Sequence, residues 1–437
     1  MNAGTESPIP SETEGQSESG WLARVCDEPF RVFFPLGLVA SVLGVLLWPA
    51  YHFHWFRWHG MDLVFEEVAA VHARWMICGF GGCFIIGFLG TAGPRLIGAG
   101  SFSRFELIWH FSLAVAMLLA LALGDGQVAV ADLLTAIWLL GVLCSLAYRI
   151  LVERTDVPPP GFPLVILGMV LACLSSFTLA LDPIITLEFG TRQLARLVLF
   201  QGFVWLPILG VAPYLLPRFF GRDSEHAFDE SETIPPGWWE RFFPGLVAAL
   251  CLLASFVMEV HGLVRAGLVL RALVIGVYLL LTVPGVLRGL RGGGLTTALR
   301  VAVISAVGGW AVAAWFAAPD FAKVRIGWLH VSLVAGAGLF MLSVATRVFL
   351  GHSGRHDRLA GPMRWFHAVW GLVLLAATTR ASAELLPRVK QSHYNYAAGT
   401  WVVIVLLWAW KIRAERRAPV YDEASWGKKS RCPRRKK

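Results

Sequence analysis

Charged side chains are scarce in this sequence of 437 residues. Asp, Glu, Lys and Arg together make up 15% of the chain, whereas hydrophobic residues make up 56% and the mean hydropathy is +0.62. A water-soluble domain usually carries about 25% charged residues. Because so much apolar surface cannot be buried in water-soluble cores, the composition excludes soluble, disordered and collagen-like proteins. It predicts a polytopic membrane protein.

Several catalytic and binding motifs are also missing. The chain has no P-loop, which leaves ATP-driven transport unsupported, and it has neither GxSxG nor HExxH. Its seven cysteines form no CxxC pair, so they imply neither a zinc site nor a disulfide framework. No CxxCH sequence occurs, and any haem would therefore be a non-covalent b-type haem.

Long apolar runs, in contrast, are abundant. Twelve of them reach the length of about 20 residues that crosses the hydrocarbon layer of a membrane. They show no strand alternation, and only helices or closed barrels satisfy the backbone in lipid. We therefore predict an all-α integral membrane protein with about 12 transmembrane helices. The predicted spans cover residues 32–51, 71–93, 105–123, 128–150, 162–181, 192–216, 243–262, 266–287, 297–317, 327–350, 365–386 and 395–412.

The basic residues indicate how the spans are oriented. Of the 38 Lys and Arg residues, 27 fall on the side of the membrane where the chain ends lie, 9 fall on the opposite side, and 2 lie inside spans. When the C-terminal tail is left out, 16 residues on the first side remain against 9 on the other. This bias predicts that both termini are cytoplasmic. We expect a disordered N-terminal tail (1–28), a membrane domain (29–415) and a basic C-terminal tail (416–437). The basic tail is typical of an anchor facing an anionic leaflet, and nothing else favours nucleic-acid binding.

Three predicted spans end alike at the cytoplasmic face. The second ends on Pro94-Arg95-Leu-Ile-Gly, the sixth on Pro217-Arg218-Phe-Phe-Gly and the tenth on Arg347-Val-Phe-Leu-Gly. Because four spans separate each ending from the next, the pattern suggests three four-helix units. The alternative is that Arg followed by Gly is a common way to end a helix at an inner interface.

The histidines carry the most information about function. Seven of the twelve gather at the predicted outer face. His72 and His330 lie at or just inside the outer ends of the second and tenth spans, which run in the same direction, so the two residues have similar depth. An ionisable residue inside a bilayer is by default a functional-site hypothesis, and imidazole is a common ligand of haem iron and copper. The pair could therefore hold a haem, although a histidine hydrogen-bonded between helices is the simpler alternative.

A haem would also need cationic partners for its propionates. Arg74 lies inside a predicted span, two residues after His72, and Arg380 and Glu384 are expected to pair on one helix face because of their i,i+4 spacing. The outer ends of other spans supply six further cations, whose ordinary role is interfacial anchoring. They are Arg192, Arg196, Arg265, Arg271, Lys323 and Arg325.

Two long segments of the chain resemble the NnrS family. One runs from His72-Ala-Arg-Trp-Met through Gly87-Phe-Leu-Gly-Thr-Ala-Gly-Pro, and the other runs from Trp328-Leu-His330 to the ending Gly351-His352-Ser-Gly-Arg355. The second match is the more specific, because the GH(S/T)GR ending is characteristic of the family. With the opening Pro29-Phe-Arg-Val-Phe-Phe and the ending Pro217-Arg-Phe-Phe-Gly-Arg222, the resemblance covers roughly residues 25–415.

The resemblance implies a twelve-span bacterial inner-membrane protein that contains haem and copper and takes part in the response to nitric oxide and nitrosative stress. His72 matches the family's first histidine, and His330 and His352 match those of the later motif. The chain departs from the family pattern after His72, where Arg74 and Trp75 replace a His and a Glu. This departure removes a candidate ligand for copper or a second haem, and Arg74 could hold a propionate instead.

Two further histidines are candidates for metal binding. His261, with Glu259 two residues earlier, could hold another metal or handle protons. His352 lies about 33 Å along the helix from His330 at 1.5 Å per residue, so it cannot share that haem and is either a second site or a structural cap. The arrangement is also similar to the main subunit of haem-copper oxidases, but the sixth span carries no histidine, so that the usual copper site of those oxidases is absent.

Three functions remain open from the sequence. The first is a membrane protein that binds haem, with copper as a second candidate cofactor, and that consumes, binds or senses a small diatomic ligand such as nitric oxide. If it is an enzyme, it is a haem-dependent oxidoreductase. The second is a transporter of a small solute or metal complex, built on helices broken by Gly and Pro. The third is a non-catalytic assembly or sensing factor with a protein partner.

Overall fold

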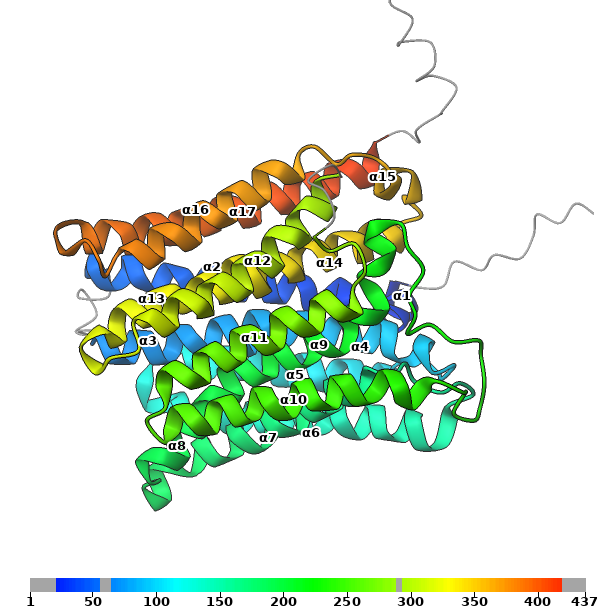
Figure 1. Cartoon of the computed structure of the whole chain (residues 1–437), viewed down its shortest axis with the longest axis horizontal. Helices are drawn as coiled ribbons and strands as arrows, with labels where there is room; N and C mark the ends of the chain where they lie inside the picture. Colours follow the sequence, from blue (N-terminus) through cyan, green and yellow to red (C-terminus); the bar gives the residue numbers. More distant parts are fainter. Residues whose placement is uncertain (1–20, 56–63, 288–292, 419–437) are drawn as a thin grey trace, which may run out of the picture.

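Long helices arranged side by side make up the molecule (Figure 1). The computed structural model describes residues 21–55, 64–287 and 293–418. Eleven stretches of the described chain are helical, long and apolar enough to cross a membrane, and the remaining predicted span is α16 (Phe366–Ser382), a helix of 17 residues that packs against α17. The prediction of an all-α polytopic membrane protein is confirmed. The unbroken long helices are α2 (Phe30–His52), α5 (Arg104–Ala122), α6 (Val128–Tyr148), α7 (Phe162–Ile185), α10 (Trp238–Val260), α11 (Val264–Thr282), α12 (Gly294–Trp315) and α17 (Lys390–Arg417).

Three spans, the second, sixth and tenth of the prediction, are helices interrupted by π-helical turns. The interruptions cover Trp75–Gly81, Val198–Gly202 and Val331–Gly338. These three spans are the most buried, with 78% of their apolar window inside the molecule, against at most 61% for the other candidate spans. The second, sixth and tenth spans are therefore alike in their structure, through the π-helical turn and the high burial, as well as in the sequences of their endings. The helices on either side of the π-helical turns are α3 (Phe65–Arg74) and α4 (Gly82–Leu96), α8 (Phe189–Leu197) and α9 (Phe203–Leu215), and α13 (Ala322–His330) and α14 (Leu339–Gly351).

Two short helices, α1 and α15, lie at one end of the molecule (Figure 1). Helix α1 covers Trp21–Asp27, so the last part of the predicted disordered tail 1–28 is helical instead. Helix α15 covers His356–Ala360. Both lie at the same end of the molecule, opposite the outer ends of α3 and α13 (Figure 1). The rest of the predicted tails, residues 1–20 and 419–437, falls outside the described residues.

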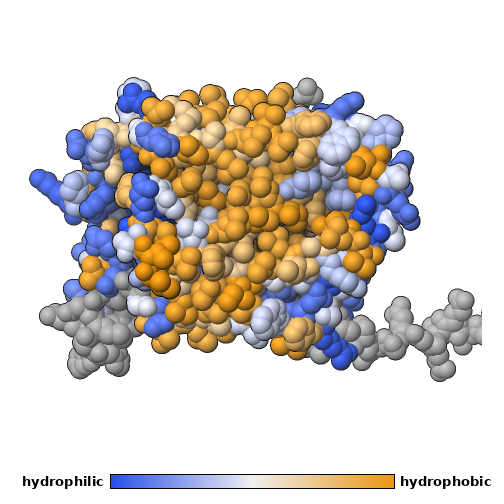
Figure 2. Space-filling model, turned by 90° about the horizontal axis from the view of Figure 1, so that it is seen from below, coloured by the Kyte–Doolittle hydropathy of each residue, from blue (hydrophilic) through white to orange (hydrophobic). Residues whose placement is uncertain are grey.

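An apolar belt surrounds the molecule between two polar ends. Figure 2 shows hydrophobic side chains across the middle of one face and hydrophilic side chains toward both ends. Large apolar side chains in the middle of the spans, such as Leu119, Leu140, Leu174 and Leu273, are exposed. Exposed apolar surface of this extent is stable only against lipid, and the belt therefore faces the bilayer.

The N-terminus of α5, which lies outside the apolar belt, is fixed by a capping box and an ion pair. Ser103 Oγ accepts a hydrogen bond from the backbone amide of Glu106 at 3.2 Å, and the Glu106 carboxylate accepts one from the amide of Ser103 at 2.8 Å. This capping box explains why α5 begins at Arg104. Arg149, at the end of α6, pairs with Glu106 at 2.7 Å and joins the two helices.

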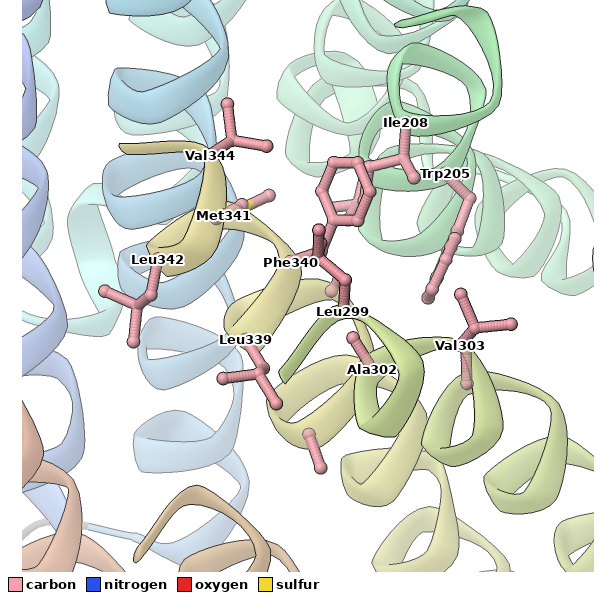
Figure 3. Close-up of a cluster of buried hydrophobic side chains, with 14 of the residues drawn as sticks. Trp205, Ile208, Leu299, Ala302, Val303, Leu339, Phe340, Met341, Leu342 and Val344 are labelled. Atoms are coloured by element: carbon pink, nitrogen blue, oxygen red, sulfur yellow. The ribbon is translucent and has the colours of Figure 1, made fainter. Parts of the chain in front are cut away.

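The interrupted spans pack on their neighbours through bulky apolar side chains. Figure 3 shows Trp205 of α9, Leu299 of α12 and Phe340 of α14 pointing toward one another. Trp205 also stacks edge to face on Trp310 of α12, with ring centroids 5.0 Å apart. This contact places the sixth, ninth and tenth predicted spans around a single core and fixes the tenth span, which carries His330, in position.

Candidate functional site

A large cavity opens among the interrupted spans at the end of the molecule opposite α1 and α15. Its volume is about 620 Å³, and its lining is mostly apolar. A cavity of this size is in the range that holds a drug-sized or cofactor-sized ligand. The wall comes from α2, α3, α8, α9, α13, α14, α16, α17 and the π-helical turns. Its ionisable and phenolic side chains are Glu66, His72, Arg74, Arg196, Lys323, His330, Arg380, Glu384 and Tyr394.

His72 and His330 meet in this cavity. Their rings are nearly parallel, at 17°, with centroids 6.5 Å apart. His72 Nδ1 donates to the carbonyl of Gly44 in α2 at 2.8 Å, and His330 Nδ1 donates to the carbonyl of Ile326 at 2.8 Å. Because a carbonyl only accepts, both Nδ1 atoms carry the proton, and each neutral ring keeps its lone pair on Nε2. Neither Nε2 has a hydrogen-bond partner in the described part of the chain.

The helix geometry explains how two distant residues come together. His72 lies three residues before the first π-helical turn, and His330 directly precedes the third. Such turns widen the helix locally and are frequent at functional sites. Gly44 matters as well, because a Cβ there would lie 2.8 Å from the Cβ of Trp75. The close approach of α2 thus brings the Gly44 carbonyl within reach of His72.

Aromatic side chains close the cavity beside His72. The Trp48 ring lies 5.6 Å from the His72 ring, 4.8 Å from that of Tyr394 and 5.3 Å from that of Phe65. Trp48 and Tyr394 are both buried. This aromatic group keeps the imidazole pair away from bulk water on that side.

Arg74, the cation predicted to hold a propionate, is already engaged. Its guanidinium makes two hydrogen bonds with the Asp132 carboxylate of α6, at 2.6 and 2.7 Å, and another with the carbonyl of Ala70 at 3.1 Å. Arg74 still contributes to the cavity wall, but its charge is balanced by Asp132. The sequence did carry a signal for this pair, since Asp132 is an acid inside a predicted span and needs a partner there.

Arg380 does not form the ion pair that the sequence predicted for it. It was expected to pair with Glu384, but α16 ends at Ser382, and Glu384 instead accepts hydrogen bonds from Tyr394 at 2.6 Å and Lys390 at 2.8 Å. Arg380 lies over the Tyr394 ring at 4.1 Å, and its buried Nη1 has no hydrogen-bond partner in the described residues.

Other predicted site residues lie away from the cavity. Arg325 donates to the carbonyl of Ala317 at 3.0 Å and is not part of the cavity wall. His261 is exposed at the end of α10, and its neighbour Glu259 pairs with Arg271 at 2.9 Å, so these residues form no site with His72. His352 is at the opposite end of the molecule, 2.7 Å from Glu28. The described residues contain no group of three or more His, Cys, Asp or Glu side chains that could hold a metal ion.

Fold and site together define a polytopic all-α membrane protein with a facing pair of histidines in an apolar cavity at one end of its interrupted spans. The chain belongs to the NnrS family: the family model, described as NnrS protein, matches residues 24–414 and so covers nearly all of it. No curated protein matches the chain.

Proposed function

We propose that this protein binds one b-type haem between His72 and His330 and uses it to handle or respond to nitric oxide. The observation that carries the proposal is the pair of nearly parallel imidazoles, 6.5 Å apart, inside a cavity of about 620 Å³. Membership of the NnrS family supports the same interpretation.

The dimensions of the pair fit a metal ion between the rings. A metal–imidazole nitrogen bond is about 2.0–2.1 Å long. Two imidazoles on opposite sides of one ion therefore hold their centroids about 6–6.5 Å apart, close to the observed 6.5 Å. The Nδ1–carbonyl hydrogen bonds supply the usual support, since metal-binding histidines almost always donate their other ring N–H to such a partner.

The polar side chains of the cavity suit a ligand with two carboxylates. Arg196, Lys323 and Arg380 line the cavity, and Arg380 offers a buried N–H without a partner. Arg74 is balanced by Asp132 and Glu384 by Lys390, which leaves these three cations against Glu66. They are the residues that would hold the propionates, with Arg380 contributing most because its N–H is the buried one.

The two histidines are held differently, and this difference bears on the chemistry. A haem held by these two imidazoles would supply one-electron chemistry when bound. His72 is fixed by a carbonyl of another helix, whereas the carbonyl that holds His330 belongs to its own helix, four residues earlier. We infer that His72 would be the more firmly positioned of the two residues that would hold the haem, and His330 the less firmly positioned one.

The orientation of the site follows from the predicted topology. With both termini in the cytoplasm of a bacterium, the cavity opens toward the periplasmic face of the inner membrane. Copper has less support than haem, because the described residues offer no three-ligand group and Arg74 and Trp75 stand at family His and Glu positions. If the protein is an enzyme, it is a haem-dependent oxidoreductase acting on nitric oxide or a related species.

The test is a reduced-minus-oxidised visible spectrum of the purified protein with iron and copper assays on the same sample. A b-type Soret and α-band pair is expected in the wild type and in His261→Ala, the matched control outside the cavity. His72→Ala should lose the haem, and His330→Ala should retain part of it in a form that binds nitric oxide more readily.

A colourless protein from cells supplied with ample haem would contradict the proposal. The alternative would then be a transporter of a small solute or metal complex through the same cavity. The π-helical turns inside three buried spans would serve as its broken helices. Solute counterflow in proteoliposomes would test that alternative.

A further inference from the structure

A second hollow lies at the other end of the same two interrupted spans. Its volume is about 400 Å³, and it lies near α15, on the side of the described chain ends (Figure 1). Neither the family match nor the haem proposal gives it a role. It is lined by Arg95, Leu215, Val344, Arg347, Val348, Gly351, His352, His356 and Leu359.

The cationic and titratable side chains of this hollow come from segments far apart in the sequence. Arg95 is in the last turn of α4, Arg347 is in the last turns of α14, and His352 directly follows α14. His356 begins α15. Thus two of the three span endings that are alike in the sequence, those of the second and tenth spans, line this hollow with an arginine each, together with two histidines.

The charge of the hollow is largely uncompensated. No Asp or Glu is among the residues that line it. Arg347 lies over the Phe219 ring at 4.7 Å and has no acidic partner in the described part of the chain. The nearest carboxylate to Arg95 is that of Glu28 at 3.8 Å, and Glu28 also serves Arg31 and His352. One carboxylate is therefore shared between two guanidinium groups and one imidazole.

His352 reinforces the conclusion that the hollow suits an anion. Its Nδ1 lies 2.7 Å from the Glu28 carboxylate, and Arg95 Nη1 lies 3.1 Å from the same Nδ1 and 3.4 Å from Nε2. A metal ion on this imidazole would lie beside Arg95 and Arg347, which would repel it. The role of second metal site, which the sequence left open for His352, is thus disfavoured by its surroundings.

We propose that this hollow binds a phosphate group, either on a free anion or on the headgroup of an anionic lipid. Two arginines from different helices line the hollow, and a guanidinium group offers forked donors that match phosphate oxygens in strong, charge-assisted hydrogen bonds. The predicted position at the cytoplasmic interface makes both sources available. The proposal is independent of whether the cavity at the other end holds haem.

The test compares thermal unfolding of the full-length protein in a neutral, phosphate-free detergent, with helix content from circular dichroism as the folding control. Inorganic phosphate is titrated against sodium chloride of equal ionic strength. In parallel, the protein is placed in nanodiscs of phosphatidylcholine with or without phosphatidylglycerol. The variants are Arg95→Gln, whose half-exposed side chain can be replaced without disturbing the fold, and the double variant Arg95→Gln/Arg347→Gln. Arg413→Gln removes one exposed cation of the last helix as a control.

A free phosphate compound is supported as the ligand if phosphate stabilises the wild type and Arg413→Gln equally. The apparent affinity for phosphate should then be about tenfold weaker in Arg95→Gln. Stabilisation by phosphatidylglycerol alone, lost in the same variant, would support a lipid headgroup. The proposal is overturned if neither probe stabilises the wild type beyond the chloride control, or if Arg413→Gln loses the effect as fully as Arg95→Gln.

Discussion

At the residue scale, the question is which arginine in the cavity of His72 and His330 has an N–H group available for an anionic ligand. The sequence drew attention to Arg74 and Arg325, because one lies inside a span and the other at an outer end. In the structure Arg74 is paired with Asp132 and Arg325 binds carbonyls elsewhere, while Arg380 offers a free buried N–H. Sequence spacing could not show this, because it depends on α16 ending before Glu384.

Replacing Arg380 should therefore weaken haem binding and change the redox behaviour. We expect Arg380→Gln to bind haem about tenfold more weakly, since one charge-assisted hydrogen bond is worth about 1.5–3 kcal/mol. Loss of a nearby positive charge should also lower the midpoint potential, because the oxidised iron carries one more positive charge than the reduced iron. Haem titration and potentiometry on the purified protein measure both effects, with Arg325→Gln as the control. Equal effects in the two variants would count against Arg380 as a propionate partner.

His226 should make stability depend on pH. It is buried in the loop between α9 and α10; burial, and to a smaller extent Arg241, lowers its pKa to about 4. The unfolded chain has a histidine pKa near 6.5, so the unfolded state binds more protons between pH 6.5 and 4. The contribution of the neutral His226 ring to the free energy of unfolding is thus complete above about pH 6.5. It falls as the pH drops, by at most about 2 kcal/mol at pH 5.

Thermal unfolding of the wild type and of His226→Gln from about pH 7.5 to about pH 5 measures this dependence. The wild type should lose more stability than the variant over that range, because only the wild type must protonate a buried ring. Parallel pH profiles for the two proteins would assign the dependence to other groups.

At the element scale, the positions of the helices could be predicted, but their interruptions could not. Each predicted span overlaps a helix of the structure, because a long apolar run in lipid leaves the backbone one good solution. No residue pattern in the second, sixth or tenth span predicts a π-helical turn. Such a turn arises from packing between helices, which a single sequence does not display.

The third π-helical turn depends on one glycine of α12. A Cβ at Gly309 would contact Ser332 Oγ and lie 2.6 Å from the Ser332 backbone nitrogen, just beyond His330. Ser332 Oγ in turn donates to the carbonyl of Ala306 at 2.8 Å. We expect Gly309→Ala to cost about 1–3 kcal/mol from overpacking and to displace His330. Gly308, with nothing within 4 Å of its Cβ position, is the matched control.

The measurement for this pair is the thermal midpoint together with the haem-to-protein ratio. Gly308→Ala should be neutral or slightly stabilising, because Ala is the better helix former. Gly309→Ala should lower both quantities. If both variants behave like the wild type, α12 does not fix the position of the turn.

At the scale of the whole molecule, the interrupted spans connect two sites of different chemistry. The second and tenth spans contribute the facing histidines at one end and two arginines at the other. The positive-inside bias of the sequence predicts that the arginine end faces the cytoplasm and the histidine cavity the periplasm. The described chain ends lie together at the arginine end (Figure 1), as an even number of spans requires.

Single cysteines in an otherwise cysteine-free protein test this orientation. A cysteine at exposed Gly262, between α10 and α11, should react with a membrane-impermeant maleimide in cells with a permeabilised outer membrane. A cysteine at exposed Gly221, after α9, should react only after the inner membrane is opened. The opposite pattern would turn the cavity toward the cytoplasm. It would also place Arg95 and Arg347 at the periplasmic face, where the inner leaflet's anionic lipids and cytoplasmic phosphate compounds are out of reach. Orientation is therefore the one property on which both proposed sites depend, and this labelling tests it without requiring either ligand.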